Sequence, residues 1–402
     1  LLGGAVFEKN GLRPEPCEQN SVDRSPWWLR RRDALLELGV QYLNAYVYDA
    51  TTVESAARRL QDMQSVDRVL FAMKSNFNPD LLRLLASTDV DFECVSPAEI
   101  EHLLSACPSL VKDRILFTPN FAPRADYEWA LGNGIRTTLD NLYPLRAWPE
   151  LFADKEVFVR IDPGLGRGHH AHVITSGEHS KFGIPLFEID ELVRLTAEIG
   201  TTVSGIHAHS GSGIPEVDTW GLLATTLAEV AERFPQADTL DLGGGLAVPS
   251  RPGDKPFDLS MMDQALTAVR NRFPDYRIWI EPGRYLVAEA GVLLSHVTQL
   301  KGKGDRQYVG IATGMNALIR PSLYGAHHDI VNLTRYDEPA GGTVTVVGPI
   351  CESGDTLGVD RRLPACQEND VVLLLNAGAY GRVMASEYNL RPIPPEILLA
   401  AD

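Results

Sequence analysis

The sequence is poor in cysteine, and the few cysteines that it has are irregularly spaced. They number five among 402 residues: Cys17, Cys94, Cys107, Cys351 and Cys366. An odd number without paired spacing argues against a disulfide framework and against a zinc site built from cysteine pairs. We therefore expect a reducing compartment and predict a cytoplasmic protein.

The sequence also lacks an excess of basic charge and any long apolar run. Its formal net charge is −16, which argues against nucleic acid and anionic membranes as partners. No apolar stretch reaches the length of a membrane span, and we predict no signal peptide. Because the first residue is Leu1, not methionine, we expect the true start to be missing, and a fusion to another domain stays open.

What is present is an ordinary globular composition, with 44% hydrophobic and 22% charged residues. The length suits one large α/β unit with an appendage, or two to three domains. Strand-like apolar runs alternate with segments of helical periodicity, which begin at 53–64 and are clearest at 96–106, 187–199, 218–233 and 261–273. The strand-like runs lie at 68–74, 89–95, 114–118, 135–139, 156–162, 202–209, 238–242 and 277–281.

Eight strands alternating with helices predict an α/β fold with a (β/α)8 barrel of the TIM type, with an open doubly wound sheet as the alternative. After residue 286 the pattern changes, because the apolar runs 341–347 and 370–375 have no comparable helices between them. We therefore expect a barrel over 45–285 and a second, mostly β domain over 286–402. Residues 1–44 match no pattern and are expected to join the β domain in part.

Residues able to do chemistry fall where the predicted strands end, which is the functional face of such a barrel. Lys74 ends the first strand and is either a snorkelling surface lysine or a partly desolvated amine able to form a Schiff base with a carbonyl cofactor. Asp241-Leu-Gly-Gly-Gly-Leu246 ends the seventh strand. Its glycines expose backbone N–H groups that suit a phosphate, although a tight turn would also explain them.

Two further strand ends carry charged or histidine side chains. Glu281-Pro-Gly-Arg284 ends the eighth strand, where the two charges either bind a ring nitrogen and an anion or pair with each other. His207-Ala-His209 ends the sixth strand, and because alternate residues face opposite sides, one histidine is expected to enter the site. The histidine-rich stretch 168–183 lacks the pattern of a metal site, so we predict a substrate loop there and no metal.

Taken together, these residues resemble the fold-type III pyridoxal 5′-phosphate-dependent decarboxylases, which share their architecture with alanine racemase and ornithine decarboxylase. The resemblance runs from about residue 45 to the end of the chain. Three motifs are similar to those of the diaminopimelate decarboxylases within this group: the stretch 168–183, Arg320-Pro-Ser-Leu-Tyr324-Gly-Ala, and Gly348-Pro-Ile-Cys351-Glu352-Ser-Gly-Asp355.

The resemblance implies a role for each matching residue. Lys74 would carry pyridoxal phosphate, Glu281 would hold its ring nitrogen protonated, and His209 would stack on the ring. The remaining cofactor contacts would come from Ser212, Gly243, Gly244, Gly245, Gly283, Arg284 and Tyr380. The distal end of the substrate would be bound by Arg284, Arg320, Tyr324, Glu352 and Tyr380, and Cys351 would return a proton to the carbanion.

The implied reaction is meso-diaminopimelate to L-lysine and CO2, in a homodimer where the Cys351-Glu352 loop completes the partner's site. The second amino-acid head of diaminopimelate needs cations and an acid, which the arginines and Glu352 supply. Alternatives are a decarboxylase of ornithine, arginine or a carboxylated polyamine, a racemase of related fold, and an inactive regulatory homologue. The family usually has aspartate where this chain has Glu93, which leaves the contact of that residue with Lys74 open.

Overall fold

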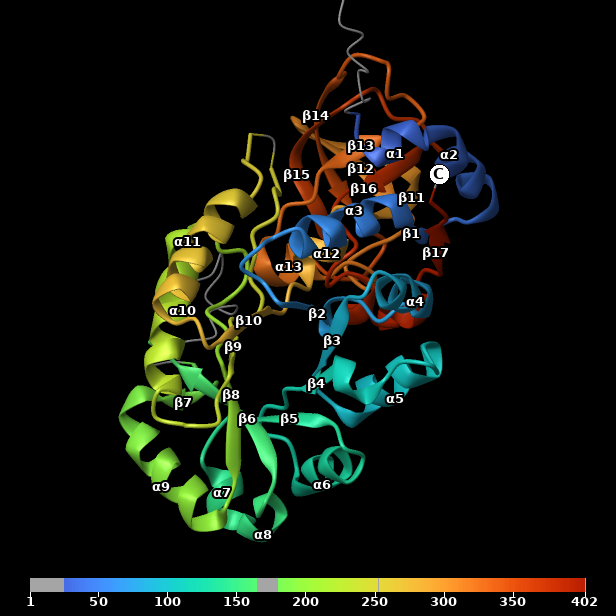
Figure 1. Ribbon diagram of the computed structural model, residues 1–402. Helices are drawn as coiled ribbons and strands as arrows, with labels where there is room; N and C mark the ends of the chain where they lie inside the picture. Colours follow the sequence, from blue (N-terminus) through green and yellow to red (C-terminus); the bar gives the residue numbers. More distant parts are fainter. Residues whose placement is uncertain (1–24, 165–179, 252, 402) are drawn as a thin grey trace, which may run out of the picture.

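The computed structural model describes residues 25–164, 180–251 and 253–401 and contains two sheets (Figure 1). A closed barrel occupies the lower part of the view, and a mostly β domain, coloured orange to red, lies above it. Among the described helices, none is both long and apolar enough to cross a bilayer.

Eight parallel strands form the barrel, and each lies within one of the predicted strand-like runs. They are β2 (Arg68–Ala72), β3 (Asp91–Cys94), β4 (Ile115–Phe117), β5 (Arg136–Leu139), β6 (Glu156–Asp162), β8 (Thr202–His207), β9 (Thr239–Asp241) and β10 (Arg277–Ile280). Pairing of β10 with β2 and of β5 with β6 closes the cylinder, and the short β7 (Ile184–Pro185) extends from β6. The (β/α)8 barrel is confirmed, and the open-sheet alternative was wrong.

Helices between the strands cover the outside of the barrel. They are α3 (Ala50–Gln61), α4 (Pro79–Ser87), α5 (Pro97–Ala106), α6 (Arg124–Gly132), α7 (Tyr143–Ala147), α8 (Pro149–Phe152), α9 (Ile189–Ile199), α10 (Asp218–Ala231), α11 (Leu259–Arg272) and α12 (Arg284–Val287). Side-chain caps begin several of them: Asn78 accepts the N–H groups of Asp80 and Leu81, and Ser96 accepts that of Glu99. Helices were expected between the strands, although α4, α6, α7 and α8 were not among the segments with the clearest helical periodicity.

The β domain has the long strand β11 (Gly291–Lys303) at its centre. The sheet runs β13 (Ile330–Asn332), β16 (Val371–Leu374), β11, β12 (Arg306–Ile311), β14 (Gly342–Val347), β15 (Thr356–Leu363). The helices α1 (Trp27–Arg30) and α2 (Arg32–Gln41) pack against this sheet. Trp27 and Leu35 form one apolar cluster with Val292 and Leu294 of β11. The short helix α13 (Arg320–Tyr324) lies between β12 and β13.

Strand β1 (Ala45–Asp49) also belongs to the β domain, not to the barrel. It pairs antiparallel with β11 and parallel with β17 (Glu396–Leu399), the last described strand. The domain boundary expected at residue 45 was therefore too early, because the barrel segment begins with α3. An apolar strand followed by a helix reads like the start of a βα unit, whichever sheet it joins.

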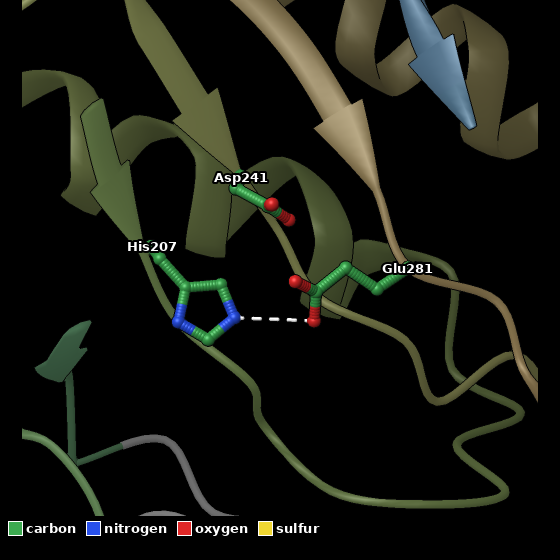
Figure 2. Close-up of side chains that lie close together, drawn as sticks. All are labelled: His207, Asp241 and Glu281. Atoms are coloured by element: carbon green, nitrogen blue, oxygen red, sulfur yellow. Dashed lines mark hydrogen bonds and ion pairs between the residues drawn. The ribbon is translucent and has the colours of Figure 1, made fainter. Parts of the chain in front are cut away.

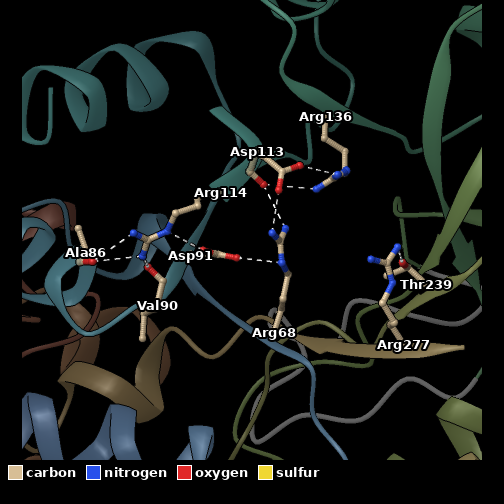
Figure 3. Close-up of polar contacts among 9 residues, drawn as sticks. All are labelled: Arg68, Ala86, Val90, Asp91, Asp113, Arg114, Arg136, Thr239 and Arg277. Atoms are coloured by element: carbon tan, nitrogen blue, oxygen red, sulfur yellow. Dashed lines mark hydrogen bonds and ion pairs between the residues drawn. The ribbon is translucent and has the colours of Figure 1, made fainter. Parts of the chain in front are cut away.

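The amino-terminal end of the barrel is closed by aromatic rings under a network of arginines. Trp279 is buried, and its ring centroid lies 4.9 Å from the Arg68 guanidinium and 5.1 Å from that of Arg136. Asp113 joins these two arginines through contacts of 2.8 Å each (Figure 3). The ring of Phe158 packs against Trp279 at 5.3 Å. These described side chains therefore fill the barrel at the amino-terminal end of its strands.

We expect Trp279→Ala to lower the free energy of unfolding by about 3–5 kcal/mol, because it removes a fully packed ring from this closed end. Trp279→Phe keeps a ring under Arg68 and should cost less. Thermal and urea unfolding measure both effects. The turnover rate of the folded fraction should stay unchanged in both variants, and an equal cost for the two would contradict the packing argument.

Candidate active site

The carboxyl ends of the barrel strands meet the β domain around a cavity of about 420 Å³. Polar side chains from both domains converge on it, as expected for a ligand site. Its lining residues include Lys74, Glu93, Thr118, Asn120, Arg160, Lys181, Phe182, His207, His209, Ser212, Glu281, Arg284, Arg320, Tyr324, Tyr380 and Met384.

Lys74 lies in a single 3-10 turn (Met73–Ser75) directly after β2, so the strand itself ends two residues earlier than expected. Its Nζ lies 2.8 Å from Glu93 Oε2, and Thr118 donates to the other oxygen of the same carboxylate. Burial lowers the pKa of Lys74, but the charges of Glu93, Tyr380 and Glu281 together outweigh this, and the net shift is upward. The longer side chain of Glu93 therefore does reach Lys74, which the sequence left open.

The triple-glycine segment forms a turn after β9 that only glycine can make. Gly243 and Gly245 have φ values of 65° and 116°, and a Cβ on Gly244 would lie 2.3 Å from the Glu281 carbonyl oxygen. The N–H of Gly243 donates to Asp241 and that of Gly244 to His209 Nδ1, so these two amides hold the turn itself. The turn lines a small cavity of about 30 Å³ beside the large one, together with Ser212, Gly283, Arg284 and Tyr380.

A buried group of two carboxylates and one imidazole lies beside Lys74 at the ends of β8, β9 and β10 (Figure 2). The potential ligand atoms of His207, Asp241 and Glu281 all lie within 4.8 Å of one another, and His207 Nε2 is 3.2 Å from Glu281 Oε2. Burial and the charge of Glu281 raise the pKa of Asp241. Burial also raises the pKa of Glu281, but His207, Lys74 and His209 together outweigh it, and the net shift is downward. Because the three groups are buried together, the charge states of the two carboxylates depend on their neighbours.

Two arginines form the side of the cavity nearer the β domain. Arg284 Nη2 donates to Ser212 Oγ at 3.1 Å, and its guanidinium lies 4.8 Å from the centroid of the Tyr380 ring. Arg320, at the start of α13, donates to His328 Nε2 at 3.0 Å. Burial and the charge of Arg320 lower the pKa of His328 to about 3, so that imidazole is neutral and accepts the proton. Both guanidinium groups remain cationic at neutral pH.

The predicted residues Cys351 and Glu352 lie elsewhere. Both are exposed, on the loop between β14 and β15, and neither lines the cavity of the described chain. The Cys351 N–H donates to Asn389 Oδ1 at 2.8 Å, and the Tyr388 hydroxyl donates to Glu352 at 2.7 Å. All other predicted site residues come together around the two cavities, apart from Gly243, which holds the turn beside them.

Other cavity residues were not predicted. Arg160 on β6 is buried, lies 3.6 Å from Asp140 and stacks over Phe182 at 4.4 Å. The sequence could have indicated Arg160, because a charged residue inside an apolar strand must find a buried partner. Of the histidine-rich stretch, residues 168–179 lie outside the described residues, while Lys181 and Phe182 line the cavity.

Comparison with known proteins agrees with this geometry. Residues 50–288 match the family model "Pyridoxal-dependent decarboxylase, pyridoxal binding domain". The diaminopimelate decarboxylase of Methanothermobacter thermautotrophicus is 36% identical over 88% of this chain and 86% of its own length. That of Escherichia coli K12 is 33% identical over 88% of each chain.

Among solved structures, diaminopimelate decarboxylase from Helicobacter pylori, complexed with L-lysine, superimposes with a TM-score of 0.81 at 27% identity. The match covers 89% of this chain and 91% of that one. On the matched barrel and on these whole-chain similarities, the chain belongs to the pyridoxal-dependent decarboxylase family.

Proposed function

We propose that this chain removes CO2 from meso-diaminopimelate to give L-lysine, with pyridoxal phosphate bound through Lys74. The observation that carries the proposal is the joining of three elements in one cavity: an amine beside a carboxylate, a buried carboxylate for a ring nitrogen, and two arginines opposite. The relatives that share this whole-chain architecture carry the same activity in their names.

The residues present fit the cofactor. Glu281 Oε1 is buried and has no hydrogen-bond partner among the described residues, so a ring N–H would satisfy it. The glycine turn, Ser212 and Gly283 line the small cavity together with Arg284, whose cation suits a phosphate. When bound, pyridoxal phosphate supplies an electron sink for the electron pair that CO2 leaves behind.

The side chains around the cofactor would each hold or orient one part of it. Lys74 would hold it covalently by its amine and release it to the amine of the substrate. Burial and the charge of Lys74 lower the pKa of His209, and a neutral imidazole suits stacking on the ring. Glu93 would receive the ammonium of Lys74 once the substrate has replaced it, since the two lie 2.8 Å apart.

Recognition of the substrate would fall to the arginine side of the cavity. Diaminopimelate has a carboxylate at its distal end, and Arg284 and Arg320 offer guanidinium groups for it, with the Tyr324 and Tyr380 hydroxyls nearby. Ornithine and lysine lack that carboxylate. A cavity that buries two arginines without an anion would penalise them.

The proton that replaces CO2 would come from a second copy of the chain. Cys351 and Glu352 lie on an exposed loop away from the cavity of their own chain. We propose a homodimer in which this loop covers the partner's cavity, bringing Cys351 to the carbanion and Glu352 to the distal amine. We also propose a cytoplasmic location, supported by the four described cysteines, all of which are free thiols.

We expect purified protein with pyridoxal phosphate to release CO2 from meso-diaminopimelate with a kcat/KM roughly a hundredfold or more above that for L-ornithine, L-arginine or L-lysine. Carbon dioxide release from the four compounds measures this directly. Arg320→Leu should raise the KM for diaminopimelate and so lower the ratio of its kcat/KM to that of the other three compounds. Arg306→Leu, which replaces an exposed arginine of β12, serves as the control. Preference for ornithine or arginine would contradict our reading of Arg320 and Glu352.

A further inference from the structure

One buried residue of the cavity has no part in the mechanism above, although it contacts a residue that does. His207 ends β8, its neighbour Asp241 ends β9, and Glu281 follows the last residue of β10. These strands are adjacent, and the register sets His207 opposite Asp241 and Asp241 opposite Trp279, two residues before Glu281. The three side chains consequently meet at one level of the barrel (Figure 2).

The hydrogen bonds within this group divide the oxygens of Glu281 into two kinds. Oε2 lies 3.2 Å from His207 Nε2, whereas Oε1 is buried without a partner among the described residues. The backbone of Glu281 is held as well, because its N–H donates to the Gly243 carbonyl at 2.9 Å. Asp241 accepts the Gly243 N–H at 2.9 Å through Oδ1, while its Oδ2 is buried without a hydrogen-bond partner among the described residues. Among the described residues, His207 is thus the side chain that donates to the Glu281 carboxylate.

We propose that His207 is a positioning residue, which holds Glu281 by one oxygen and leaves the other to receive the ring N–H of the cofactor. A carboxylate with two free oxygens could turn about its last torsion and bond to Lys74, which lines the same cavity. Binding one oxygen removes that freedom before the cofactor arrives, which is preorganisation of a charged hydrogen bond. The inference rests on the proposed cofactor but not on the identity of the substrate.

The experiment measures cofactor affinity, not turnover. The wild-type protein, His207→Leu and His207→Gln are freed of cofactor and titrated with pyridoxal phosphate, following absorbance and protein fluorescence. We expect His207→Leu to bind roughly ten- to a hundredfold more weakly, the effect of one hydrogen bond to a charged group. Glutamine keeps an N–H donor on a side chain of similar reach, so His207→Gln should recover most of the affinity.

Two controls separate positioning from a general structural effect. His296→Leu removes another buried imidazole, in the β domain, and should leave the affinity unchanged. The same titrations are then made with the 1-deaza analogue of pyridoxal phosphate, in which a C–H group replaces the ring nitrogen. Because Glu281 has no N–H to receive there, wild-type and His207→Leu proteins should bind the analogue equally.

Each outcome decides one question. A loss of affinity in His207→Leu that persists with the deaza analogue would overturn the proposal, since it would show a defect unrelated to the ring nitrogen. Equal affinity of His207→Leu and wild type for pyridoxal phosphate would overturn it as well. Failure of the wild-type protein to bind pyridoxal phosphate would instead defeat the proposed function, so the two failures are distinguishable.

Discussion

Replacing Lys74 by alanine is expected to lower the rate of CO2 release from meso-diaminopimelate roughly 10⁴-fold or more, as removal of a covalent catalyst ordinarily does. The cavity would keep Glu281, His209 and the glycine turn, so the variant should still bind the cofactor noncovalently. Borohydride reduction followed by peptide mass spectrometry gives the second readout. The cofactor should be found on Lys74 in the wild-type protein and on no lysine in the variant.

Lys181, a second lysine that lines the cavity, tests whether the cofactor is attached specifically at Lys74. Lys181 lines the same space, with its Nζ 5.1 Å from the Phe182 ring, and is exposed toward solvent. Lys155, on the surface before β6, is a control for loss of a lysine elsewhere, and Lys155→Ala should retain the wild-type rate. Labelling of Lys181 in the wild-type protein would overturn the assignment of the covalent position.

Two inactive variants should restore each other's activity when they share a dimer. Cys351→Ala is expected to lose roughly 10²–10⁴ in rate, the contribution of a positioned acid, and Lys74→Ala more. If Cys351 acts on the partner's cavity, a mixed dimer has one doubly altered site and one intact site. Coexpression of the two should therefore recover about a quarter of the wild-type activity, given random pairing of subunits.

The matched control pairs two variants of the same cavity. Lys74 and Glu281 face each other within one chain, so a mixed dimer of Lys74→Ala and Glu281→Ala has one lesion in each site and should stay inactive. Activity in that control, or none in the Cys351 pair with both proteins folded, would contradict a shared site. Light scattering of the mixed preparation gives the oligomeric state independently.

The barrel could be predicted from the sequence because its strands are buried on both faces and read as continuous apolar runs. Several runs also ended at or close to a residue that the structure places in the cavity, such as Lys74 or Glu281. The position of β1 could not be predicted this way, because pairing between residues 45–49 and 291–294 is a long-range property that local pattern does not encode.

The site, too, could be predicted only in part from the sequence. The contact between Glu93 and Lys74 depended on side-chain reach from two neighbouring strands, and only coordinates supply that distance. The hydrogen bonds between Arg320 and His328 and between Glu281 and His207 could not be predicted either. In each pair the two residues lie in different segments, and local periodicity does not show which segments meet. Cys351 and Glu352 were recognised by motif resemblance, whereas their position on an exposed loop outside the cavity is a tertiary feature that the motif does not encode.

The pairing of β1 with β11 and β17 has a consequence for how the protein is made on the ribosome. Strand β1 leaves the exit tunnel long before its parallel neighbour β17 is synthesised. At 5–20 residues per second, the edge of β1 that pairs with β17 waits on the order of tens of seconds without its partner. The barrel can close during that interval, whereas the β domain cannot be completed until β17 has been synthesised. A nascent chain stalled before β17 would therefore expose an apolar strand, the kind of segment that chaperones bind.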